Sequence, residues 1–157
     1  MSRKIKVAAD LGEICWAFED ASLESRYYLD LKTGEVIFVS DFMDTEEIEE
    51  IEEELSAGFE RYIKIQKMPP REGYEDMKDF IETVQDENLK EKLYIAIDGR
   101  GAFRRFKNVL LSYPEERERW FKFKDARVRE RVKEWLDAEG IEIIDTNEPD
   151  REKRNQK

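Results

Sequence analysis

Hydrophobic and polar residues alternate in the first half of the chain and follow a helical period in the second half. The clearest alternation lies in residues 26–31 and 35–40, two runs of aromatic and β-branched residues separated by Lys32, Thr33 and Gly34. Gly34 can supply the positive φ that a short hairpin loop requires. The pattern therefore predicts a β-hairpin over residues 26–40.

Shorter alternating segments predict further strands. Ile63 and Ile65 alternate with polar residues within residues 61–66, and two prolines at positions 69 and 70 end that segment. Residues 4–7 and 141–144 show a similar, shorter pattern. One or two of these segments are expected to join the hairpin in a small antiparallel sheet.

Apolar residues that recur every three or four positions predict the helices. Asp10 is placed to cap the first helix, with Glu13 in the capping-box position. Later helices are predicted over residues 45–57, from about Tyr74, after Asp86, from about Ala102 and from Pro114, with Asp125 capping a continuation that stops at Gly140. Residues 146–157 are polar and charged, and we predict a disordered tail there.

Together these elements predict an α+β fold with a small antiparallel sheet and a helical C-terminal half. The chain has 157 residues, which suits a single domain, and we place that domain at residues 1–145. An arrangement of two subdomains, residues 1–68 and 71–145, agrees equally with the break at the two prolines.

The composition excludes several kinds of chemistry. The chain has no histidine and one cysteine, so His-based catalysis, His-containing zinc sites and intramolecular disulfides are excluded. Cys15 falls on an apolar helical face and is predicted to be buried. The sequence contains neither a Gly-x-Ser-x-Gly elbow nor a Ser-x-x-Lys motif. It therefore favours a non-catalytic protein without cofactor or metal, with a carboxylate-based enzyme as an alternative.

Charge is unevenly placed along this acidic chain. The net charge is −11, with −13 in residues 1–97 and +2 in residues 98–157. Seven glutamates in residues 45–57 are predicted to form a solvated helix face rather than a metal site. No apolar run approaches membrane-spanning length and no apolar targeting segment opens the chain, so we expect a cytoplasmic protein that does not bind membranes.

One short run carries four cations and no acid after Asp98. A helical wheel places Phe103 and Phe106 on a broad apolar face, which predicts core packing, whereas Arg104 and Lys107 point away from it. Further cations and aromatic residues follow after residue 119. The candidate binding residues are Gly99, Arg100, Gly101, Arg104, Arg105, Lys107 and Trp120.

Three interpretations of this run stay open. The glycines can form a turn between two helices, while the arginines snorkel along apolar surface or pair with the chain's own glutamates. Alternatively, the helix start can bind a phosphate, a carboxylate or a nucleic acid. The arginine-rich and glutamate-rich helices can also pair between copies of the chain. The sequence favours a binding or regulatory module that engages a protein partner or forms a homo-oligomer, with nucleic-acid or phosphate binding through residues 99–107 as the alternative.

The motifs around this run resemble those of a bacterial family of uncharacterised proteins, number zero-one-five-eight of the UPF series. The resemblance rests on Gly-Arg-Gly-Ala-Phe-Arg-Arg-Phe-Lys at residues 99–107, Trp120-Phe121, Glu134-Trp135-Leu136 and Gly140-Ile141. Further matching motifs lie at residues 28–36, 71–74 and 79–81, so the resemblance covers nearly the whole chain to about residue 141. It implies neither an activity nor catalytic residues.

Overall fold

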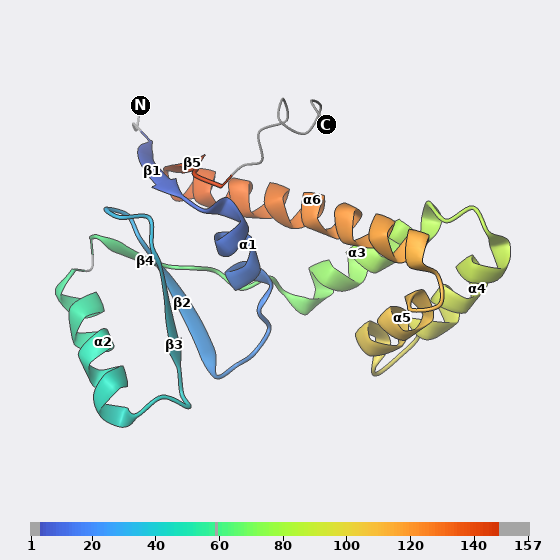
Figure 1. Ribbon diagram of the computed structural model, residues 1–157, viewed down its shortest axis with the longest axis horizontal. Coiled ribbons are helices and arrows are strands. Elements are labelled where there is room, and N and C mark those ends of the chain that lie inside the picture. Colours follow the sequence, from blue (N-terminus) through green and yellow to red (C-terminus); the bar gives the residue numbers. More distant parts are fainter. Residues whose placement is uncertain (1–3, 59, 148–157) are drawn as a thin grey trace. The chain divides into compact units, whose positions relative to one another are not determined.

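A computed structural model describes residues 4–58 and 60–147 of the chain (Figure 1). Its contacts divide the chain into two compact units: unit 1 comprises residues 1–67 and 129–157, and unit 2 comprises residues 68–128. The fold is mixed α+β with a helical C-terminal half, as predicted. The interpretation of residues 1–145 as one domain stays a prediction.

Unit 1 contains all five strands found in the described residues. The predicted hairpin is formed by β2 (Ser25–Asp30) and β3 (Val36–Ser40), and β4 (Tyr62–Lys64) joins it in an antiparallel sheet of order β3-β2-β4. The acidic helix α2 (Thr45–Ala57) packs beside β3 (Figure 1). All seven of its glutamates are exposed, which confirms the predicted solvated face.

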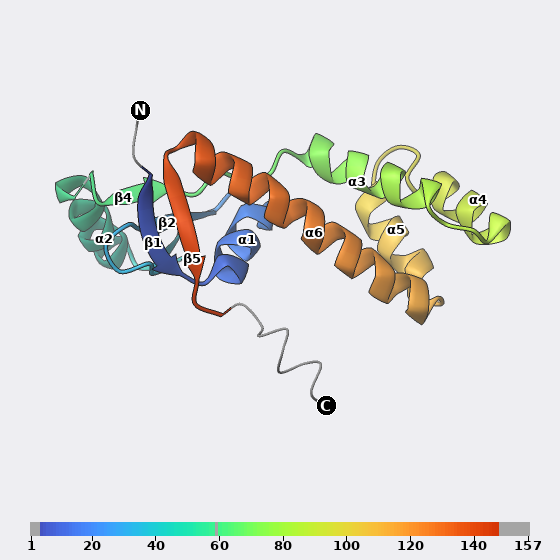
Figure 2. The ribbon, with the colours of Figure 1, turned by 90° about the horizontal axis from the view of Figure 1, so that it is seen from above.

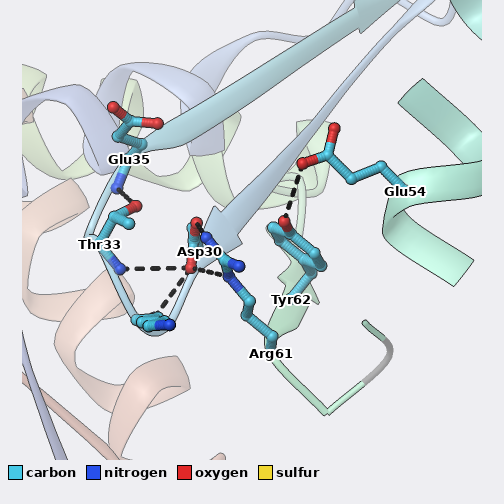
Figure 3. A network of polar contacts seen from close by, with 7 residues as sticks. Asp30, Thr33, Glu35, Glu54, Arg61 and Tyr62 are labelled. Atoms are coloured by element: carbon cyan, nitrogen blue, oxygen red, sulfur yellow. Dashed lines mark hydrogen bonds and ion pairs between the residues drawn. The ribbon is translucent and has the colours of Figure 1, made fainter. Parts of the chain in front are cut away.

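The hairpin turn of unit 1 is held by a buried carboxylate (Figure 3). Asp30 accepts hydrogen bonds from Arg61 Nε at 2.9 Å and Nη2 at 2.7 Å, and from the backbone N–H groups of Lys32 at 2.9 Å and Thr33 at 3.2 Å. These bonds, the guanidinium first, hold the pKa of Asp30 well below its usual range. Gly34 has φ +80°, as predicted, and closes the turn.

The remaining strands of unit 1 form a separate parallel pair. Strand β1 (Ile5–Ala9) leads into α1 (Leu11–Glu19) and pairs with β5 (Ile141–Asp145), with Ile5 opposite Ile141 (Figure 2). Both strands were expected, but their pairing was not, because alternation marks a strand without naming its partner. Asp145 Oδ1 also accepts a hydrogen bond from the Leu11 N–H at 3.2 Å.

Unit 2 is entirely helical. It contains α3 (Pro70–Glu82), α4 (Glu87–Ala96), α5 (Ala102–Leu110) and the first part of α6 (Pro114–Ala138). Its core is aromatic: the Trp120 ring lies 4.8 Å from the Phe106 ring and 5.3 Å from the Phe80 ring, between centroids, in edge-on contacts. These contacts come from α3, α5 and α6, so they join three helices.

Several predicted details of the helices are corrected. Helix α3 begins at Pro70 rather than near Tyr74, because proline fits the first turn of a helix, where its missing N–H is not needed. Helix α6 runs unbroken through Asp125 for 25 residues (Figure 2), so Asp125 caps nothing. Phe103, predicted to be in the core, is 44% exposed. Most of the predicted tail, from residue 148 onward, lies outside the described residues.

Candidate functional site

The cationic run folds into a tight turn between α4 and α5. Gly99 and Gly101 have φ values of +84° and +77°, in the left-handed region that disfavours other residues. At the end of α4, the Ile97 N–H donates a hydrogen bond to the carbonyl oxygen of Leu93 at 3.1 Å. At the start of α5, the Arg105 N–H donates a hydrogen bond to the carbonyl oxygen of Gly101 at 3.0 Å. The two glycines therefore reverse the chain direction, as the structural interpretation predicted.

Arg105 is the side chain around which this turn is built. Its guanidinium donates to the carbonyl oxygens of Ala96 at 2.8 Å and Asp98 at 2.7 Å, and also to that of Arg100. A cation at the C-terminal end of α4 also offsets the partial negative charge of the helix dipole there. The guanidinium is thus engaged by backbone carbonyls of the turn, rather than by the glutamates that the structural interpretation expected.

The other three cations of the run behave differently. The side chains of Arg100, Arg104 and Lys107 are exposed, and they form no hydrogen bond or ion pair with any residue in the described parts of the chain. Arg104, Lys107 and Leu111 share one side of α5 because they are spaced three and four positions apart. Phe103, next to them, is 44% exposed and Leu111 is 60% exposed. We use the name α5 face for the exposed residues Phe103, Arg104, Lys107 and Leu111 together with Arg100, which lies in the turn before α5.

Two other arginines of unit 2, Arg119 and Arg127, are paired with acids. Arg119 Nη2 lies 2.7 Å from Glu116 Oε2. Arg127 Nη1 lies 2.6 Å from Asp79 Oδ2, and its guanidinium covers the Phe123 ring at 4.8 Å. Unit 2 as a whole holds 13 basic and 13 acidic residues, so acids are not scarce in it. The cations of the α5 face are therefore set apart from acids by their position on the fold.

The remaining candidate residue, Trp120, lies in the core. It is 5% exposed, so only a small part of its side chain reaches the surface. Trp120 packs against Phe80 and Phe106, and its predicted role as a contact residue stays a prediction. Its indole Nε1 is buried and has no hydrogen-bond partner among the described residues.

A shallow hollow extends the α5 face toward α6. Its volume is about 190 Å³, and it is lined by Lys107, Leu110, Leu111, Arg117, Trp120 and Phe121. The Arg117 guanidinium lies 5.1 Å from the Phe121 ring centroid. We call this feature the α5–α6 hollow. Sequence reasoning missed it because its walls come from two helices. The signal that the sequence offered is Leu111, an apolar residue next to two cationic positions of the same helical side.

Within the described ranges, no group of three or more Asp, Glu and Cys side chains is placed to hold a metal ion. None of the helices in those ranges combines the length and the apolar character needed to cross a membrane.

The fold and site define an α+β protein whose helical unit presents a cationic and partly apolar face. The family model described as Uncharacterised protein family (UPF0158) matches residues 9–156. The chain therefore belongs to this family, which confirms the resemblance inferred from its motifs. The function of the family is not established.

Similar proteins occur in two bacterial genera. A UPF0158 protein of Pseudomonas aeruginosa is 27% identical over 133 residues, which cover 85% of this chain and 84% of that protein. UPF0158 proteins of Chlamydia trachomatis and Chlamydia pneumoniae are each 31% identical over 121 residues, or 76% of this chain. This chain spans only 37% of the length of those chlamydial relatives. No solved structure matches the chain.

Proposed function

We propose that this chain is a non-catalytic binding module that engages an acidic protein partner through the α5 face. The observation that carries the proposal is the absence of any described partner for the side chains of Arg100, Arg104 and Lys107. Arg105, between them in sequence, donates from each of its three side-chain nitrogens to a backbone carbonyl. A surface that keeps three cations without acids, beside exposed apolar groups, is complementary to carboxylates and apolar side chains on another protein.

The apolar residues of the face favour a protein over a nucleic acid. Phe103 and Leu111 are large and exposed at one end and side of the helix. Aromatic side chains such as Phe103 are enriched in protein interfaces, and Leu111 adds apolar surface beside it. Nucleic-acid binding depends mainly on neutralised phosphates, and the face offers three cations in a chain of net charge −11. Nucleic-acid binding is therefore the alternative, and the experiment must distinguish it from binding of a protein.

The test uses the full chain, immobilised and exposed to a bacterial lysate with and without nuclease treatment. The double variant Arg104→Glu with Lys107→Glu reverses two charges of the face. We expect it to retain a captured protein at least about tenfold less well than the wild type, because each reversed contact pair costs about 1 kcal/mol or more. Unchanged circular dichroism and unfolding temperature establish that the variant is folded.

The matched control is Arg71→Glu with Lys78→Glu, which changes the net charge of the same unit equally on exposed positions of α3. Capture that survives in this control, survives nuclease and falls with salt supports the proposal. Capture that is equal for the α5-face variant and the wild type contradicts it. If nuclease abolishes capture and labelled oligonucleotides bind in a salt-sensitive way, the α5 face binds nucleic acid and the alternative is supported.

A further inference from the structure

The α5–α6 hollow defines the chemistry of what can occupy it. The exposed cations Lys107 and Arg117 line it together with the apolar residues Leu111 and Phe121. Its volume of about 190 Å³ is several times the roughly 30 Å³ share of a water molecule, so it has room for a side-chain ring. The fitting occupant is an apolar side chain flanked by carboxylates.

The chain itself carries a segment with this chemistry, in unit 1. Phe42, between β3 and α2, is 84% exposed. The turn around it is fixed: the Phe42 N–H bonds to Ser40 Oγ at 3.2 Å and the Met43 N–H to the Ser40 carbonyl at 3.1 Å. Asp44, at the start of α2, makes no capping hydrogen bond with its side chain. An exposed aromatic residue thus lies two positions before an exposed carboxylate that has no partner among the described residues.

The carboxylates continue into the first turn of α2. Glu46 and Glu47 are exposed there, and with Asp44, Thr45 and Glu50 they line an acidic surface depression. Unit 1 as a whole holds 26 acidic and 15 basic residues, whereas unit 2 is balanced. The acidic counterpart of the cationic hollow is therefore present in the same chain.

We propose that the partner of the α5–α6 hollow is a second copy of this chain. Phe42 of one copy enters the hollow of the other, and Asp44 and Glu47 pair with Lys107 and Arg117 across the contact. This inference rests on the proposed function and identifies its partner. The contact is heterologous, because the two surfaces differ, so copies either exchange the contact reciprocally or continue it into a larger assembly.

The first experiment measures the mass of the full chain in solution, by light scattering and sedimentation equilibrium, over a range of concentration and at low and high salt. The wild type is expected to associate with increasing concentration and to dissociate as salt screens the charge pairs. Phe42→Ser is expected to weaken association at least about tenfold, as for loss of an interface anchor. The control is Leu23→Ser, which removes an equally exposed apolar side chain, 94% exposed, from the same unit.

The second experiment is a charge swap. Lys107→Glu with Arg117→Glu, and Asp44→Lys with Glu47→Lys, are each expected to be monomeric when alone. Their equimolar mixture is expected to associate again, because the reversed hollow then meets the reversed segment. Folding of each variant is checked by circular dichroism. Recovery in the mixture cannot come from a variant that merely fails to fold.

A wild type that stays monomeric at every concentration and salt overturns the inference, and so does a Phe42→Ser variant that associates like the wild type or a charge-swap mixture that stays monomeric. The proposed function is scored separately by the capture experiment. A monomeric chain that still captures a foreign acidic protein through the α5 face overturns the second copy as partner and leaves the binding module standing.

Discussion

Two adjacent arginines are expected to differ sharply in their effect on stability. Arg105→Ala removes the guanidinium that bridges the carbonyls of Ala96 and Asp98, at 2.8 and 2.7 Å. Hydrogen bonds from charged groups contribute about 1.5–3 kcal/mol each when protected from water. Because Arg105 is half-buried and water can replace part of these bonds, we expect a loss of about 2 kcal/mol. Arg104→Ala removes an exposed side chain with no described partner and is expected to cost less than about 0.5 kcal/mol.

The assay is urea unfolding followed by tryptophan fluorescence. Trp120 lies in the core of unit 2, whereas Trp16 and Trp135 belong to unit 1, so a background with both of these changed to Phe reports on unit 2 alone. Arg105→Lys keeps the charge but offers one nitrogen in place of three, and it is expected to fall between the wild type and Arg105→Ala. Equal free energies of unfolding for the Arg104→Ala and Arg105→Ala variants would refute the structural role of Arg105.

Two further predictions concern the hairpin turn of unit 1. The pKa of Asp30 is lower in the folded state than its unfolded value of about 4, so the ionised carboxylate stabilises the fold above that pH, and this stabilisation is lost as pH falls through the folded-state pKa. The difference in unfolding free energy between the wild type and Asp30→Asn should therefore shrink below about pH 4 in acid titrations. A difference that stays constant would contradict this prediction. Gly34→Ala places a Cβ 1.9 Å from the Ala8 carbonyl oxygen at φ +80°, whereas Gly140→Ala at φ +75° meets open space. Thermal unfolding should show a cost of about 1 kcal/mol for Gly140→Ala and several-fold more for Gly34→Ala, and equal costs would contradict the close approach.

Local periodicity was enough to predict most of the elements. The hairpin around Gly34, the cap at Asp10 and the solvated face of α2 follow from neighbours within a few positions, and all three are found in the structure. The side chain of Asp10 accepts the Glu13 N–H at 3.2 Å, as its position predicted. These features depend on backbone preference and side-chain spacing, which are properties of short segments.

Features that join distant segments could not be predicted in this way. The pairing of β1 with β5 brings together residues more than 130 positions apart, and the sequence of neither strand identifies its pairing partner. The exposure of Phe103 depends on which part of the broad apolar face of α5 the neighbouring helices cover. The wheel gives the direction of a side chain but not the limits of the surface that covers it.

The candidate site shows the same division. From the sequence alone, Arg104 points away from the apolar face of its helix and Arg105 lies at the margin of that face, and the glycines beside them predict a turn. The tertiary structure decided that Arg105 is used by the carbonyls of that turn, whereas Arg104 reaches no described partner. A hydrogen bond depends on where the chain returns in space, within a few tenths of an ångström, and the sequence pattern carries no such distance.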